Sequence, residues 1–249
     1  MTAQSDNYAL ITGGASGIGL ATAYALAATG TTVAILDRAE NGPDGFHFVN
    51  ADVTNDASVQ GAVESVIGHF KTLDILVNCA GVGAQGGISA NSDEEWHFVW
   101  DVNVVGMARV TRAALPLLLR SSSAAIVNVS SVAATVGLPD RVLYSATKGA
   151  VLSMTMAMAA DLLPYGVRVN AVNPGTTDTP WIGRLLESSP DPQLERESLM
   201  GRQPHGRLVT PEEVAGAIVY LASPTSGSTT GTYLAVDGGM QRVRNRPQS

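Results

Sequence analysis

Short apolar runs alternate along the chain with longer segments in which apolar residues recur every three or four positions. The apolar runs predict strands that are covered on both faces, because they contain almost no polar residues. The seven expected strands are residues 8–11, 32–36, 46–49, 74–78, 124–130, 167–172 and 232–236. Such strands, alternating with helices, indicate an α/β fold: one doubly wound domain over residues 1–249 with a seven-stranded parallel sheet.

The helical segments follow the strands. We expect one helix after the first glycine-rich turn, one over 58–70, a long one over 93–120 and one that carries Tyr144. Another opens at Thr210 with a proline and two glutamates, a typical helix start. Residues 174–206 are predicted to be irregular, and no repeat or linker marks a second domain.

Composition narrows the class of protein. The net charge of −7 and the lack of a basic run argue against a nucleic-acid partner. One cysteine among 249 residues excludes an intrachain disulfide and suits a reducing compartment. The amino terminus has no signal-peptide core, and no apolar run reaches the ~18 residues of a membrane span. We expect a cytoplasmic protein without a membrane partner, part of whose apolar surface is covered by other subunits.

The glycine-rich turn "TGGASGIG" (12–19) lies between the first strand and the first helix. Gly13 permits the turn, Gly17 lets the backbone approach a pyrophosphate, and Gly19 lets the helix pack close to the sheet. The helix dipole favours a phosphate at this end. We expect Ser16 and Ile18 of the same turn at the cofactor as well, although the glycines could also serve only to make a tight turn.

Asp37 ends the second strand, about 20 residues beyond the glycines, where an acid can accept hydrogen bonds from an adenosine ribose. A carboxylate there repels the 2′-phosphate of NADP, and Ser16 provides no base in the turn to attract it. Arg38 argues the other way, since an arginine after this strand can bind that phosphate. Asp37 stands at the strand end, so NAD is favoured over NADP.

Tyr144 and Lys148 in "YSATK" are four residues apart and therefore share one face of a helix. A lysine this close would lower the pKa of the phenol and make it a usable acid or base near neutral pH. The alternative is a packed ring beside a lysine that reaches water.

Six motifs occur in one order: "TGGASGIG", "NCAG" (78–81), Asn103, "NVSS" (128–131), "YSATK" and "NPG" (173–175). With them the chain resembles the short-chain dehydrogenase/reductase family, from the first strand to "VDGG" (236–239). The resemblance implies a Rossmann-type domain that binds NAD(P) and transfers hydride between the nicotinamide and a secondary alcohol or ketone.

The resemblance also implies roles for single residues. Tyr144 is the expected acid/base, and Lys148 lowers its pKa and holds the nicotinamide ribose. Ser131, rather than Ser130, binds the substrate oxygen, and Asn103 holds a water of a proton relay. Further expected cofactor contacts are Asp52, Val53, Asn78, Ala80, Gly81, Pro174, Gly175, Thr177 and Thr179. Cys79 departs from the family pattern, and we interpret it as structural.

Other functions are less well supported. The histidines (47, 69, 97 and 205) lack metal-ligand spacing, so no metal site is expected, and no G-x-S-x-G turn indicates a serine hydrolase. A non-catalytic NAD-binding sensor or scaffold predicts loss of Tyr144, Lys148 or Ser131, and all three are present. A dehydrogenase of a sugar, sugar acid or hydroxy acid and a 3-oxoacyl-thioester reductase both stay open, with Asp37 and the acidic balance favouring the first.

Two segments bear on substrate and assembly. Residues 176–206 match the family's substrate lid and contain Trp181, Arg184, Arg202 and His205. Residues 240–249 form a basic tail with Arg242, Arg244 and Arg246. These arginines either face solvent or anchor an anionic group of the substrate. The apolar helix after Tyr144 predicts a closed homo-oligomer, a tetramer as is common in the family.

Overall fold

The strands form one parallel sheet. The computed structural model describes residues 7–68, 70, 72–187 and 189–244. Within them the sheet has seven strands, in the order β3-β2-β1-β4-β5-β6-β7, and each neighbouring pair is parallel. The strands are β1 (Tyr8–Thr12), β2 (Thr32–Asp37), β3 (His47–Asn50), β4 (Ile75–Asn78), β5 (Ala125–Val129), β6 (Arg168–Pro174) and β7 (Tyr233–Val236). The strand order reverses between β1 and β4, so the predicted doubly wound fold is confirmed.

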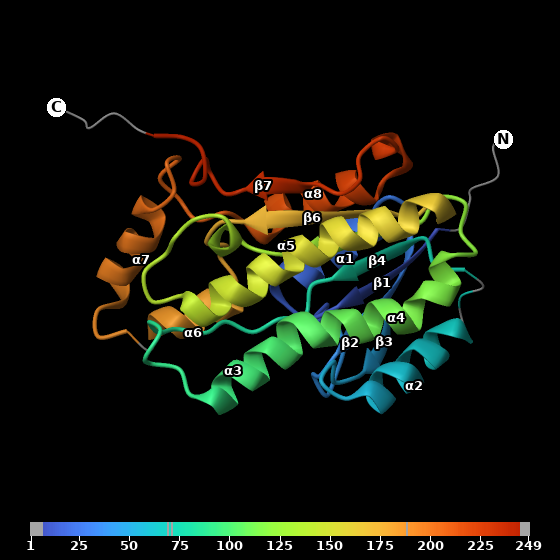
Figure 1. Cartoon of the computed structure of the whole chain (residues 1–249), viewed down its shortest axis with the longest axis horizontal. Helices are drawn as coiled ribbons and strands as arrows, with labels where there is room; N and C mark the ends of the chain where they lie inside the picture. Colours follow the sequence, from blue (N-terminus) through green and yellow to red (C-terminus); the bar gives the residue numbers. More distant parts are fainter. Residues whose placement is uncertain (1–6, 69, 71, 188, 245–249) are drawn as a thin grey trace.

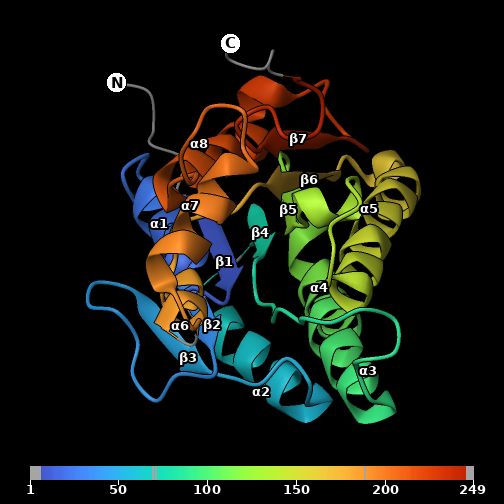
Figure 2. The same cartoon turned by 90° about the vertical axis from the view of Figure 1, so that its left-hand side faces the viewer.

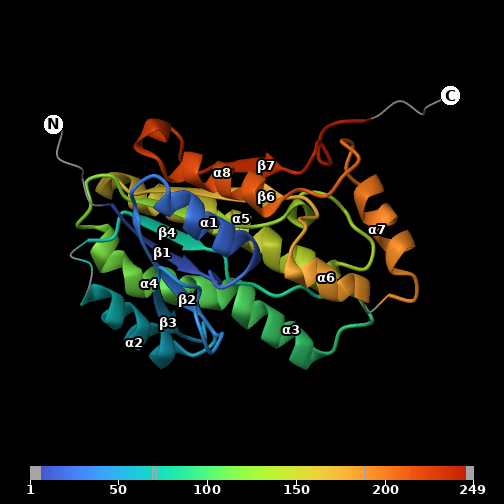
Figure 3. The ribbon, with the colours of Figure 1, turned by 180° about the vertical axis from the view of Figure 1, so that it is seen from behind.

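Helices cover both faces of the sheet (Figures 1 and 3). α1 (Gly17–Ala27) and α8 (Pro211–Ala222) lie on one face. α2 (Asp56–Ile67), α4 (Gly106–Leu118) and α5 (Val142–Leu162) lie on the other. No helix in the described part of the chain is long and apolar enough to cross a membrane.

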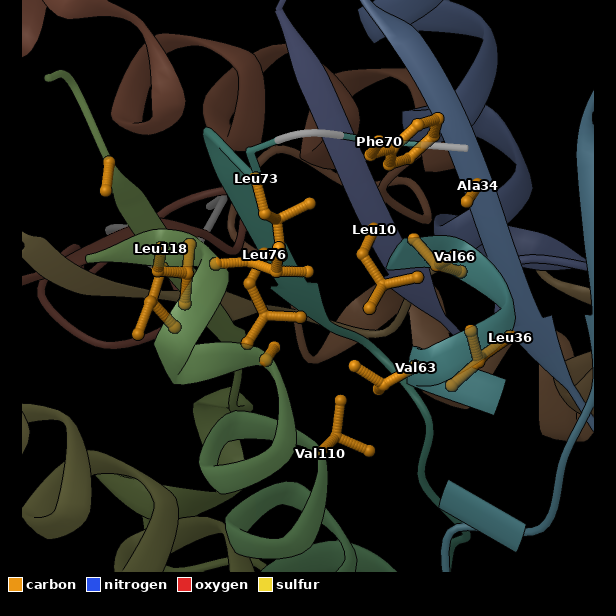
Figure 4. Packing of buried hydrophobic residues seen from close by; sticks show 14 of the residues in the cluster. Leu10, Ala34, Leu36, Val63, Val66, Phe70, Leu73, Leu76, Val110 and Leu118 are labelled. Carbon is orange, nitrogen blue, oxygen red and sulfur yellow. The ribbon is translucent and has the colours of Figure 1, made fainter. Parts of the chain in front are cut away.

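The core is divided by the sheet into two layers, because alternate residues of a strand point to opposite faces. Leu10, Leu36 and Leu76 pack with Val63 of α2 and Val110 of α4 (Figure 4). Their neighbours along each strand enter a second layer beneath α1 and α8. Burial on both faces requires apolar residues throughout the inner strands, which is why the apolar runs predicted the strand ends to within two residues.

Side-chain caps fix the start of several helices. The Asn55 side chain accepts a hydrogen bond from the Ser58 amide at 3.0 Å, so α2 begins two residues before the predicted start. Thr210 and Glu213 form a reciprocal capping box at α8, as the sequence there suggested. Short 3₁₀ turns occupy Val132–Ala134, Leu163–Tyr165 and Pro224–Ser226.

The long helix predicted over 93–120 is interrupted. It consists of α3 (Asp93–Trp100), a π-helical turn (Asp101–Val105) and α4. The interruption ends just before Gly106, whereas Pro116 is accommodated inside α4. A π-turn holds one more residue than an α-turn, and such turns occur often at functional sites. This one contains Asn103.

The segment between β6 and α8 is helical, so the prediction of an irregular stretch over 174–206 was wrong. It contains α6 (Pro180–Glu187) and α7 (Pro192–Gly201), each opened by a proline. A small apolar core of Ile182, Leu186, Leu199 and Leu208 holds the two helices together. Figure 2 looks onto this end of the molecule, with α6 and α7 on the side of α1, and α3 on the side of α5.

Arg168 connects the sheet to the end of α8. Its side chain is buried at 8% exposure and donates to the carbonyl oxygens of Leu221, Ala222 and Ser223 at 2.7, 3.2 and 3.1 Å. It also donates to Ser226 Oγ at 2.9 Å. A cation is favourable at the carboxyl end of a helix, where the carbonyls have no partners within the helix.

Candidate active site

A cavity of about 540 Å³ opens at the carboxyl ends of the inner strands. Open α/β sheets bind their ligands at this edge, near the point where the strand order reverses. Eighteen of the twenty residues predicted for the site border it: Gly13, Ser16, Gly17, Ile18, Gly19, Asp37, Arg38, Asp52, Val53, Ala80, Gly81, Ser131, Tyr144, Lys148, Pro174, Gly175, Thr177 and Thr179. The other two, Asn78 and Asn103, do not border it, and their side chains lie behind its wall.

The glycine-rich turn forms one end of the cavity and has no room for larger residues. Gly13 and Gly17 have φ of 68° and 54°, a conformation that favours glycine. A Cβ atom at Gly19 would lie 2.2 Å from the carbonyl oxygen of Gly13. The backbone N–H groups of this turn lie at the N-terminus of α1. The close approach that the glycines allow and the dipole of the helix both favour a pyrophosphate there.

Asp37 joins this turn to the end of β2. Its Oδ2 accepts a hydrogen bond from the Ala15 amide at 3.0 Å, and its Oδ1 accepts one from the Ala39 amide at 3.1 Å. Each carboxylate oxygen has a second lone pair for a ligand hydroxyl. Hydrogen bonds from the Thr54 amide and hydroxyl lower the pKa of the Asp52 carboxyl. The positive charge of the exposed Arg38 lowers it further, to a smaller extent.

Tyr144 and Lys148 lie one turn apart on α5, as their spacing predicted. The Lys148 Nζ atom is 5.7 Å from the centre of the Tyr144 ring and donates to the Val129 carbonyl oxygen at 2.9 Å. Lys148 is buried at 5% exposure, so this bond fixes its ammonium group beside the phenol. The cavity therefore holds an acid/base candidate with a fixed cation next to it.

The two serines after β5 have different partners. Ser130 Oγ donates to the Lys148 carbonyl oxygen at 2.8 Å, which ties the strand end to α5. Ser131 Oγ accepts from the Ala133 amide at 3.1 Å, and its own proton has no acceptor among the described residues. Ser131 is therefore the serine that can still donate into the cavity.

Asn103 holds the loop after β4 in place. Its Oδ1 accepts from the Val82 amide at 2.8 Å, and its Nδ2 donates to the Val82 carbonyl at 2.9 Å and to Thr147 Oγ1 at 3.1 Å. A Cβ atom on Gly81 would lie 3.1 Å from Asn103 Oδ1 and 3.4 Å from Lys148 Nζ. Both amide protons are taken by the protein, so a relay water would have to donate to Oδ1.

Asn78 was expected along the cofactor but lies in the interior. Its Nδ2 donates to Asn128 Oδ1 at 2.9 Å and to Thr111 Oγ1 at 3.1 Å, and the residue is 5% exposed. These bonds tie β4 to β5 and to α4. A motif match could not reveal this direction, because alternate strand residues point to opposite faces.

Cys79 borders the cavity without the properties of a nucleophile. Desolvation raises the pKa of its thiol to about 12, with Lys148 opposing the shift to a lesser extent. The thiolate is the reactive form of cysteine, and it is scarce at neutral pH when the pKa is this high. This agrees with the structural interpretation from the sequence.

The lid region contributes a further wall. Trp181, Arg184 and Arg202 border the cavity, and the Trp181 ring packs against Gly83, where a Cβ atom would lie 2.4 Å from it. His205 does not border the cavity and packs against Gly238.

The arginines outside the lid differ in their position relative to the cavity. In this chain neither Arg242 nor Arg244 borders the cavity, and Arg246 is outside the described residues. Arg141 does border it, yet sequence reasoning missed it. Its position three residues before Tyr144 was the available signal.

Similarity to known proteins covers almost the whole chain. Residues 13–241 match the family model described as Enoyl-(Acyl carrier protein) reductase. Cyclopentanol dehydrogenase of Comamonas sp. is 37% identical over 94% of this chain and 97% of its own length. Cis-4-hydroxycyclohexanecarboxylate dehydrogenase of Sinomonas cyclohexanicum is 38% identical over 96% of this chain and 98% of its own length.

A solved structure extends the likeness to the fold. Aldohexose dehydrogenase of Thermoplasma acidophilum superposes with a TM-score of 0.91 at 32% identity, over 98% of both chains. Together with the family model and the relatives, this agreement covers the sheet, the glycine-rich turn and the helix that carries Tyr144. The chain belongs to the short-chain dehydrogenase/reductase family of oxidoreductases, which bind a nicotinamide cofactor, and its dehydrogenase relatives indicate an enzyme that acts on CH–OH groups.

Proposed function

We propose that the chain is an NAD-dependent oxidoreductase that interconverts a secondary alcohol and its ketone. The observation that carries this is the shared cavity, in which Tyr144, Lys148 and Ser131 stand beyond the glycine-rich turn. The names of the relatives, dehydrogenases of alcohols and of an aldohexose, agree with it. A small hydroxylated substrate such as a sugar, sugar acid or hydroxy acid suits the cavity.

The residues fit a dinucleotide. The glycine-rich turn and the N-terminus of α1 would hold the pyrophosphate, and Asp37 would hold the adenosine ribose. When bound, the nicotinamide accepts hydride from the substrate carbon or supplies hydride to it.

The chain's own residues manage the proton. In oxidation the Tyr144 phenolate takes the hydroxyl proton as the substrate carbon loses hydride, and in reduction the phenol returns it to the oxygen. Ser131 donates a hydrogen bond to the substrate oxygen, where negative charge develops. Lys148, held by the Val129 carbonyl, keeps its positive charge 5.7 Å from the centre of the Tyr144 ring. Asn103 would support a relay water through Oδ1.

Asp37 supports the preference for NAD. Its carboxylate stands at the end of β2 and is tied to the turn, and no basic residue lies within the turn. A relative named ElxO was solved with NADP, so the preference rests on this chain's own residues. We expect kcat/KM to be higher with NAD, and Asp37→Asn to narrow the difference. A higher value with NADP would contradict the assignment.

Tyr144→Phe tests the chemistry. It removes the proton acceptor and keeps the ring, so turnover of any active alcohol should fall by orders of magnitude while the Kd for NAD, measured by calorimetry, stays within a few-fold. Tyr220→Phe, on the exposed part of α8, is a matched control that should keep full activity. A Tyr144→Phe enzyme with a large share of the wild-type rate would remove Tyr144 from the mechanism.

A 3-oxoacyl-thioester reductase remains the competing activity. It would reduce a thioester substrate carried by an acidic protein and would need a basic docking surface, whereas this chain has a net charge of −7. Acetoacetyl thioesters therefore belong in the substrate screen, with NADH and NADPH as reductants.

Self-association is the remaining part of the proposal. The outer side of α5 exposes Met156 at 58%, together with Ala157 and Ala160, and the following turn exposes Leu163 and Tyr165. A second subunit would cover this apolar surface, and we expect a tetramer. Light scattering at micromolar concentration measures the mass, and a monomer would contradict the assignment.

A further inference from the structure

The end of the cavity near Tyr144 is lined by cations. Arg141 lies at the start of α5, Arg184 on α6, and Arg202 directly after α7, and all three border the cavity. Among the described residues, the acids that border it are Asp37, the last residue of β2, and Asp52, which follows β3, both at the opposite end. The carboxylates that border the cavity therefore lie at the end that also holds Arg38, whereas the end near Tyr144 holds three guanidinium groups and the Lys148 ammonium group.

These arginines have no carboxylate partner within the described residues. Four other arginines of the chain form ion pairs of 2.6 to 3.0 Å: Arg109, Arg112, Arg196 and Arg207. Arg141 instead donates through Nη1 to the carbonyl oxygens of Ala84 and Asp140, at 3.5 and 3.2 Å. Its Nε and Nη2 groups, which can bind a carboxylate through two parallel hydrogen bonds, remain available.

Arg141 and Arg202 border the same cavity, near enough for their charges to interact. Burial lowers the pKa of Arg141, and the positive charge of Arg202 lowers it further. Tyr144, Asp140 and Glu195 oppose this shift to a smaller extent. Two half-buried guanidinium groups that face one cavity repel each other, and an anion between them would remove that cost. Arg184 is exposed and also borders a second hollow together with Glu95, so it belongs to the rim.

Resting on the proposed function, we propose that Arg141 and Arg202 bind a carboxylate of the substrate, which makes the substrate a short hydroxy acid or the corresponding keto acid. Arg141 precedes Tyr144 by three residues, about one helical turn or roughly 5 Å along the helix. The carboxylate and the reacting carbinol must therefore be close together on one small molecule. A thioester-linked acyl chain has no free carboxylate and does not meet this requirement.

Equilibrium binding tests the anion site without turnover. Straight-chain carboxylates from acetate to octanoate, and the amides of the same acids, are titrated by calorimetry into the enzyme with and without NAD. We expect at least one carboxylate to bind at least tenfold more tightly than its amide. In Arg141→Gln and in Arg202→Gln this preference should fall by about tenfold or more, towards equal affinity for carboxylate and amide, as expected from the loss of a charged hydrogen bond. Arg141→Lys should keep part of it.

Kinetics extends the test to the reaction. For hydroxy acids of four to seven carbons, Arg141→Gln should raise KM while the Kd for NAD stays unchanged, and the matched hydroxy amides should be unaffected. Arg112→Gln, whose side chain pairs with Asp56 on α2, is the control that should change nothing. Circular dichroism and the Kd for NAD report whether each variant is folded.

The outcomes separate this proposal from the proposed function. Carboxylates that bind the wild type no more tightly than their amides overturn the anion site, whatever the enzyme oxidises. An unchanged preference in both Arg141→Gln and Arg202→Gln overturns it as well. A Tyr144→Phe enzyme that remains active overturns the proposed function and leaves the binding result in place.

Discussion

Asn103→Ala should both destabilise the protein and weaken cofactor binding. Asn103 is 2% exposed, and its side-chain amide makes three hydrogen bonds. Two of these are with the backbone N–H and the backbone carbonyl of Val82. The truncation leaves these two backbone groups without a protein partner. Thr147 loses less, because its hydroxyl keeps its own bond to the Tyr144 carbonyl at 2.8 Å.

The expected loss follows from those bonds. A buried backbone group without a partner costs about 1–3 kcal/mol. Val82 is only half buried, so water will satisfy part of the demand, and two groups together should cost about 2–4 kcal/mol. That is a large share of the ~5–15 kcal/mol that stabilises a typical domain. Asn103→Asp keeps the acceptor for the Val82 amide, but it leaves the Val82 carbonyl without a donor and sets a carboxylate against it, so the loss should be of similar size.

Urea denaturation measures the free energy of unfolding, and titration of NAD measures how far cofactor binding is weakened. The loop held by Asn103 borders the cavity, so the Kd for NAD should rise several-fold. Asn50→Ala is the matched control, since the exposed Asn50 amide makes one bond, to the Ala39 carbonyl at 2.8 Å. A loss in Asn103→Ala no larger than in Asn50→Ala would refute the reasoning, because the Val82 groups would then be satisfied without Asn103.

Three further changes test other parts of the structure. Arg168→Met should lower the free energy of unfolding by about 2–4 kcal/mol, because the carbonyls at the end of α8 lose their buried cation; unchanged urea denaturation would contradict this. Glu213 has its pKa lowered to about 2, chiefly by hydrogen bonds from Arg207, so its stabilising effect is complete above about pH 4.5 and is lost as the pH falls towards 2. The Tm difference between wild type and Glu213→Gln should therefore shrink between pH 6 and pH 2, and a constant difference would disprove the assignment. Gly19→Ala should abolish NAD binding in a titration, whereas Gly61→Ala, at an open position of α2, should leave it intact; equal affinities would count against the close packing of the turn.

The sheet was predictable because the residues of each strand show by themselves that the strand is buried. Inner strands buried on both faces must be apolar, so they occur in the sequence as short runs of apolar residues between helical patterns. The cavity residues were predictable for a related reason, since most of them lie in motifs that directly follow a strand.

The remaining features depend on contacts between distant segments. The π-helical turn places Asn103 against Val82 and Thr147, and no pattern within 93–120 indicates that contact. α6 is short, and its apolar residues are buried only because α7 packs against them, a contact that the sequence of α6 does not indicate. Arg141 borders the same cavity as Arg202, which comes much later in the chain, and no local pattern in the sequence indicates that.

Asp37 constrains how the cofactor preference of this protein could change during evolution. Because its carboxylate also accepts a hydrogen bond from the Ala15 amide, a substitution that removes the acceptor together with the charge releases the glycine-rich turn. Asn or Ser at this position keeps an acceptor for that amide, whereas Ala or Val does not. Under the proposed preference for NAD, a mutational path towards NADP must therefore keep an acceptor for the Ala15 amide when the Asp37 carboxylate is lost.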